Sequence, residues 1–199
     1  ELTNVQVVTG MSQESVENLA TGYNNLAQEM GVTTLEVAKG SLEWLRQGKT
    51  AEQASELVKS SMVLSKLGNL DAAQSTEYLT SMMNGFKLEA DDSMDVISKI
   101  VSLDNAFATS SSEISSALQR SSVSAQQAGV TFEELASMIT VVSDVSRRAP
   151  ESIGEAFKTI FSRYQDILAG GVDDEGQGIN NVGKALERVG INIRDAEGG

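Results

Sequence analysis

Residues 128–168 read AGVTFEELASMITVVSDVSRRAPESIGEAFKTIFSRYQDIL and contain one complete copy of a unit that recurs, in looser form, along the chain. Gly129 can adopt the left-handed conformation that ends a helix. Thr131 can then accept the amide hydrogen of Glu134 while the Glu134 side chain returns to the Thr131 amide, which is the capping-box pattern. The stretch therefore predicts the end of one helix and the start of the next, with almost no loop between them.

Apolar side chains on both sides of Pro150 recur every three or four residues, which is the spacing of one helical face. The first stripe comprises Leu135, Met138, Ile139, Val142 and Val145. Pro150 fits the first turn of a second helix, where no amide hydrogen is needed. The second stripe comprises Ile153, Ala156, Phe157, Ile160, Phe161, Tyr164 and Leu168. We predict that these two helices pack as an antiparallel pair.

Similar helix starts recur at intervals of roughly 20 residues, with short connections between the helices. The predicted starts are Ser12, Thr33, Thr50, Asp71, about Ala90, Ser110, Thr131 and Ala149. The pattern predicts an all-α fold of successive antiparallel helix pairs over residues 1–169, as a helical bundle or a short α-solenoid, with residues 1–10 unassigned. Residues 170–199 are predicted to form an acidic glycine-rich loop, a short helix and an extended tail.

Four aromatic residues are candidates for contact with another protein. Trp44 lies to one side of the predicted stripe of Leu35, Ala38, Leu42 and Leu45, so it either belongs to the core or marks a contact with a partner. Phe157, Phe161 and Tyr164 belong to an apolar arc that is wider than one neighbouring helix can bury. We expect self-association or docking through this arc, the alternative being that earlier helices curl round and bury it.

Composition excludes several classes of function. The 199 residues include no cysteine and no histidine, which excludes disulfides, thiolate metal sites and histidine-based catalysis. The formal charge is −13 with scattered basic residues, so no basic surface for nucleic acid is expected. No apolar run approaches the roughly 20 residues of a membrane-spanning helix. The acidic residues at 173–175 are adjacent and lack the ligand spacing of a calcium loop, so we expect no metal and no cofactor.

Several segments resemble the core of tail tape measure proteins of long-tailed phages. They are residues 84–91, 111–120, 128–135, 179–191 and, above all, 153–166, IGEAFKTIFSRYQD. The resemblance covers approximately residues 55–195, whereas the first 50 residues share only the general character of the sequence.

The resemblance implies a non-enzymatic assembly protein around which tail tube subunits polymerise, so that its length sets tail length, and which leaves ahead of the DNA at infection. It further implies a place in the virion tail after assembly in the host cytoplasm. The implied partners are tube subunits, the tail tip or assembly chaperones; the homo-oligomer is expected separately, from the apolar arc of Phe157, Phe161 and Tyr164. The very long helical arrays and apolar segments of the family are missing here. A free-standing helical-repeat adaptor is the alternative, and a peptidoglycan-cleaving module is a distant third because no catalytic constellation is visible.

Overall fold

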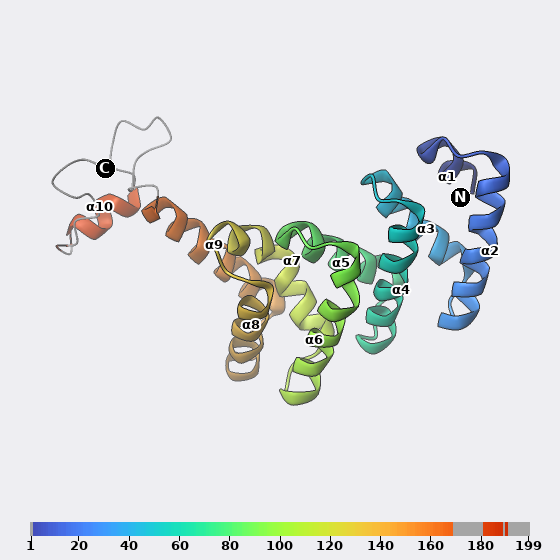
Figure 1. Ribbon diagram of the computed structural model, residues 1–199. Coiled ribbons are helices and arrows are strands. Elements are labelled where there is room, and N and C mark those ends of the chain that lie inside the picture. The colour runs from blue at the N-terminus through green and yellow to red at the C-terminus, as the bar shows by residue number, and fades with distance from the viewer. Residues whose placement is uncertain (1, 169–180, 189, 191–199) are drawn as a thin grey trace.

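The computed structural model describes residues 2–168, 181–188 and 190, and every regular element in these residues is helical. Figure 1 shows the helices side by side in an elongated array, with α1 and α2 at one end and α9 and α10 at the other. The elements are α1 (Leu2–Thr9), α2 (Gln13–Met30), α3 (Thr34–Arg46), α4 (Ala51–Leu67), α5 (Ala72–Phe86), the 3-10 turn η1 (Ala90–Asp92), α6 (Ser93–Ala106), α7 (Ser111–Gln127), α8 (Phe132–Ser146), α9 (Pro150–Leu168) and α10 (Asn181–Arg188). The prediction of an all-α fold is confirmed.

Local capping chemistry places the helix boundaries. The predicted N-caps accept the expected amide hydrogens at Ser12, Thr33, Thr50, Asp71, Ser110 and Thr131. At the junction of α7 and α8, Gly129 has a φ of 80°, and the Val130 amide donates to the Ala125 carbonyl over 2.9 Å. Pro150 occupies the first position of α9, as predicted.

The dipeptide Asn84-Gly85 has the residue types of a helix end, which predicts that the helix stops there, but it runs one residue further. Helix α5 continues to Phe86, and Lys87 takes the left-handed conformation with a φ of 56°. Gly85 is instead required by packing, because a Cβ on this residue would lie 2.5 Å from the Cβ of Ser122 in α7. A glycine that looks like a helix terminator in the sequence therefore serves a close helix contact.

The helices form two layers. Helices α3, α5, α7 and α9 stack in one layer, and α2, α4, α6 and α8 stack in the other. Each helix packs mainly against its chain neighbours and against the next helix of its own layer, so the described residues form an open α-solenoid rather than a closed bundle. The sequence left a helical bundle and a short α-solenoid as alternatives. The packing of each helix against near neighbours along the chain identifies the solenoid.

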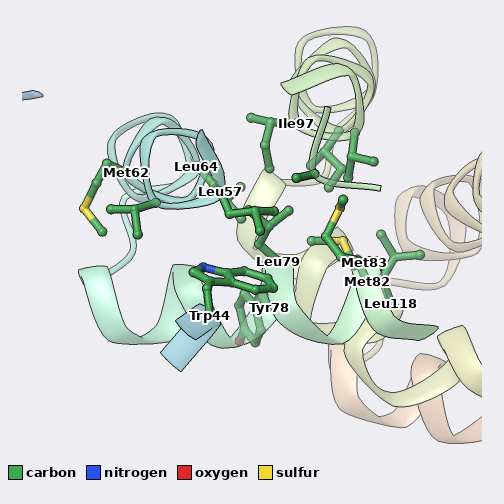
Figure 2. Packing of buried hydrophobic residues seen from close by; sticks show 14 of the residues in the cluster. Trp44, Leu57, Met62, Leu64, Tyr78, Leu79, Met82, Met83, Ile97 and Leu118 are labelled. Carbon is green, nitrogen blue, oxygen red and sulfur yellow. The ribbon is translucent and has the colours of Figure 1, made fainter. Parts of the chain in front are cut away.

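A continuous apolar core lies between the two layers and includes Leu57, Leu79, Ile100, Leu118 and Leu135, all fully buried (Figure 2). Three residues predicted to face this core are exposed instead: Leu35 by 52%, Val142 by 38% and Val145 by 79%. Leu35 lies in the first turn of α3, whose buried face centres on Val37, Ser41 and Trp44. The two valines lie on the side of α8 turned away from α6 and α7.

Small side chains bring the backbones of α5, α7 and α9 close together. Ser121 and Ser122 are fully buried, and their hydroxyls donate to the carbonyls of Ala117 and Leu118 four residues earlier. Because these hydroxyls are satisfied within their own helix, their burial carries little penalty.

The predicted division at residue 169 stays a prediction, since most of residues 170–199 lies outside the described part of the chain. The acidic loop at 173–176 and the extended tail at 191–194 fall in this outside part. Of the predicted C-terminal features, the short helix is observed as α10, which packs against α9.

Candidate protein-contact surface

The described residues include no group of three carboxylates placed to hold a metal ion. Within the same residues, no helix has the length and apolar character needed to span a bilayer. Exposed apolar side chains among the described residues are candidates for contact with another protein.

Trp44 is in the core. Its side chain is fully buried in α3, and Figure 2 shows it among the side chains of the buried cluster. The indole nitrogen has no hydrogen-bond partner among the described residues. This placement matches the core interpretation of Trp44, and in this conformation the ring offers no surface to a partner.

The aromatic arc of α9 is divided between the core and the surface. The rings of Phe157 and Phe161 stack with centroids 5.9 Å apart, and Phe161 is buried. Tyr164 is 47% exposed and Ile160 is 56% exposed. Gln165 donates to the Ser124 carbonyl of α7 over 3.3 Å, which fixes the other side of the helix against its neighbour. The earlier helices therefore cover part of the arc and leave the Ile160 and Tyr164 side open.

A second exposed apolar stripe lies on α8 and was not recognised as a surface from the sequence. Val141 and Val145 are 51% and 79% exposed, and Val142 lies beside them. At 3.6 residues per turn, Val141 and Val145 lie roughly opposite the middle of the buried side of α8, and Val142 lies at its edge. The buried residues are Phe132, Leu135, Ala136, Ile139, Thr140 and Ser143. The signal was present: apolar residues at 141 and 142 are adjacent, so they cannot both belong to a single narrow stripe.

We define the terminal apolar surface as Val141, Val142, Val145, Ile160 and Tyr164. These residues belong to α8 and α9. Interior helices such as α6 have a layer neighbour on both sides, whereas α8 has one only on the α6 side among the described residues.

The charges around this surface are balanced. Residues 138–168 contain four acidic and four basic residues, in a chain whose formal charge is −13. Arg120 of α7 pairs with Glu155 over 3.5 Å, and Arg147 pairs with Asp144 over 3.6 Å. Arg148 and Arg163 form no ion pair with any described residue. The end of the array that carries the exposed apolar side chains therefore lacks the negative charge of the rest.

A groove of 710 Å³ lies between α3 and α5, at the other half of the array. Its rim carries charges of both signs, from Glu36, Lys39, Glu43, Arg46, Asp71 and Glu77. Several of these are already engaged: Arg46 pairs with Glu43 over 3.0 Å, and Asp71 caps α5. The pKa of the Glu36 carboxyl is lowered by its capping hydrogen bonds with Thr33. The rim of the groove is therefore charged, whereas four of the five side chains of the terminal apolar surface are aliphatic.

Comparison with known families agrees with this reading of a structural helical protein. The family described as phage-related minor tail protein matches residues 10–199, which is nearly the whole chain. No solved structure matches the chain. The chain therefore belongs to the phage-related minor tail protein family, whose members are components of the virion tail.

Proposed function

We propose that this chain is a structural segment of a tail tape measure protein and acts in tail assembly, in setting tail length and in DNA ejection. The observation that carries the proposal is the open, linear stacking of helix pairs in a member of a phage tail family. In such an array each added pair lengthens the molecule without changing its other contacts. The segment most similar to tape measure proteins, residues 153–166, forms the centre of α9.

Measuring tail length tests this proposal directly. In the phage that encodes the chain, residues 111–149, which hold α7 and α8, would be duplicated. The tails, measured by electron microscopy, should lengthen by about 10 Å if the new pair stacks at a normal interhelical spacing. They should lengthen by about 60 Å if the roughly 40 added residues extend as one helix at 1.5 Å per residue. Tails of unchanged length on infectious particles would contradict a role in length determination.

The proposed role is non-enzymatic and its partners are proteins. Tube subunits, the tail tip and assembly chaperones are the partners that this role requires, after assembly in the host cytoplasm. Incubation of the purified chain with peptidoglycan should release no soluble fragments. Release that disappears when one carboxylate is changed to its amide would contradict this part of the proposal.

The groove between α3 and α5 favours a second candidate function, a helical-repeat adaptor. Grooves between stacked helices are the binding surfaces that solenoid proteins use. Mass spectrometry of purified virions separates the two candidates. A tape measure segment should be present in the finished particle, whereas an adaptor used only during assembly should be found in infected cells and be missing from the virion.

A further inference from the structure

The groove between α3 and α5 lies where two neighbouring helices of the same layer leave room between them. Further along this layer, Gly85 of α5 and Gly154 of α9 each lie directly against α7. The groove has a volume of 710 Å³, within the range of about 300–1,000 Å³ that is typical of ligand-binding clefts. Apart from two carboxylates, its α5 wall consists of small side chains: Ala72, Ala73, Thr76, Thr80 and Ser81.

Side-chain hydrogen bonds hold the groove in shape. Asn84 of α5 donates to Gln47 of α3 over 2.8 Å, which joins the two walls near their C-terminal ends. Gly40 and Thr76 are both buried, and a Cβ on Gly40 would lie 3.4 Å from the Thr76 hydroxyl, so the two helices converge beneath the groove. A preformed groove loses less conformational entropy when it binds a partner.

The α3 wall balances its own charges. Arg46 pairs with Glu43 over 3.0 Å. Lys39 lies three residues after Glu36 and four before Glu43, the two spacings at which side chains on a helix are neighbours. The two cations that line the groove are therefore matched by carboxylates of their own helix.

The α5 wall carries negative charge that is not paired. The Asp71 carboxylate accepts the backbone amide hydrogen of Gln74 over 2.8 Å, and Glu77 accepts a hydrogen bond from the Gln119 side chain of α7 over 2.7 Å. Both of these donors are neutral. Neither carboxylate forms an ion pair with any described residue.

We infer that this groove binds a basic segment of a partner protein, with small side chains against the α5 wall and cations beside Asp71 and Glu77. The two carboxylates are six residues apart, which corresponds to about 9 Å along the axis of α5. A segment in the polyproline II conformation, which unfolded chains commonly adopt, repeats every three residues over about 9 Å. Lysine or arginine at every third position therefore matches the spacing of the two carboxylates.

The charges favour this occupant over the other kinds of segment. An apolar segment would cover Asp71 and Glu77 without supplying a cation, and burial of an unpaired charge is costly. An acidic segment would be repelled by the same two carboxylates. Residues 1–137 carry 18 acidic and 8 basic side chains, so the surrounding field also attracts a basic segment.

Fluorescence anisotropy of a labelled synthetic peptide, titrated with the purified chain, tests the inference. The peptide carries lysine at every third position with alanine and proline between, and a matched peptide carries glutamate in place of lysine. In the double variant Asp71→Asn with Glu77→Gln, asparagine can still cap α5 and glutamine can still accept from Gln119, so the fold should be kept. The control double variant, Glu14→Gln with Glu17→Gln, removes the same charge from the exposed face of α2.

A third variant tests the position of the site without changing any charge. Ala73→Trp fills the groove at an exposed position of α5. Circular dichroism and thermal melting of all three variants should match the wild-type chain.

The expected result is saturable, one-to-one binding of the lysine peptide. Binding should weaken about tenfold in the α5 double variant and in Ala73→Trp, and less than about twofold in the α2 double variant. A wild-type chain that binds neither peptide, or binds the glutamate peptide equally well, overturns the inference. Equal weakening by the α5 and α2 double variants would show attraction to the whole acidic surface, and unchanged binding by Ala73→Trp would place the site elsewhere. Either of these results also overturns it.

The inference holds for the tape measure role and for the adaptor role alike. Peptide binding by the purified chain and tail length after duplication are separate measurements, so each can fail while the other succeeds.

Discussion

The layer of α5, α7 and α9 is packed backbone to backbone, whereas in the other layer lysine side chains bridge α2 to α4 and α6 to α8. A Cβ on Gly154 of α9 would lie 2.7 Å from the Ala117 carbonyl oxygen of α7. In the other layer, Lys99 of α6 reaches Glu133 of α8 over 2.6 Å, and Lys59 of α4 reaches Glu29 of α2 over 3.0 Å. Unequal spacing of two layers makes a solenoid curve towards the closer layer. Side-chain size therefore sets the shape of this array.

The largest effect is expected from filling the close contacts of the first layer. Gly154→Ala should destabilise the chain by about 3 kcal/mol, because the added methyl group meets the backbone of α7, which cannot move without repacking. Gly85→Ala should also destabilise, through its clash with Ser122. Urea unfolding followed by circular dichroism measures both losses.

Gly22→Ala is the matched control for these two substitutions. Gly22 also lies inside a helix, α2, but a Cβ there meets no atom within 4 Å. The higher helix propensity of alanine should therefore stabilise this variant by about 0.5–1 kcal/mol. If all three substitutions had the same effect, the close approach of α7 and α9 would be refuted.

A smaller effect on stability is expected at the turn that connects α7 to α8, which joins the two layers. Gly129 has a φ of 80° and open space around it, so a substitution is opposed by backbone strain alone. Gly129→Val should destabilise the chain by about 1–2 kcal/mol. Gly129→Asn should lose less, because asparagine tolerates the left-handed conformation. Equal losses in thermal melts would show that strain at this residue does not determine the turn.

The N-cap of α8 at Thr131 should contribute less to the stability of the chain than the turn at Gly129. The Thr131 hydroxyl accepts the Glu134 amide over 3.3 Å, and Glu134 accepts the Thr131 amide over 2.9 Å. Thr131→Ala removes the first of these bonds and should cost about 1 kcal/mol, while Thr131→Ser should be nearly neutral. Amide hydrogen exchange should show faster opening in the first turn of α8 for the alanine variant only.

The smallest effect is expected from the ion pair that bridges α6 and α8. The hydrogen bond from Lys99 lowers the pKa of the Glu133 carboxyl below its ordinary value of 4.5. A lowered carboxyl pKa gives stability that is complete above the ordinary value and is lost as the pH falls through the lower folded value. Lys99→Met should remove this acid dependence and, because both groups are solvent-exposed, change stability by less than about 1 kcal/mol. An unchanged slope of stability between pH 5 and 3, about where carboxyls titrate, would contradict the assignment.

Helix boundaries were predictable because the signals that set them are local. Thr131 and Glu134 are three residues apart, and Gly129 needs only its own backbone to take a positive φ. The errors at Gly85 and Leu35 arose where a nonlocal contact overrode the local pattern.

The sequence by itself determined the helical elements and their short connections, because capping residues and apolar spacing act over a few positions. Its resemblance to phage tail proteins agrees with the family that matches the chain. Only the tertiary structure decided that the pairs stack in an open array, that Trp44 is buried, and that Val145 and Ile160 are exposed at one end. Two apolar sides of a helix look alike in sequence. Which side is covered depends on whether another helix is there to cover it, and that neighbour is set by packing over the whole array.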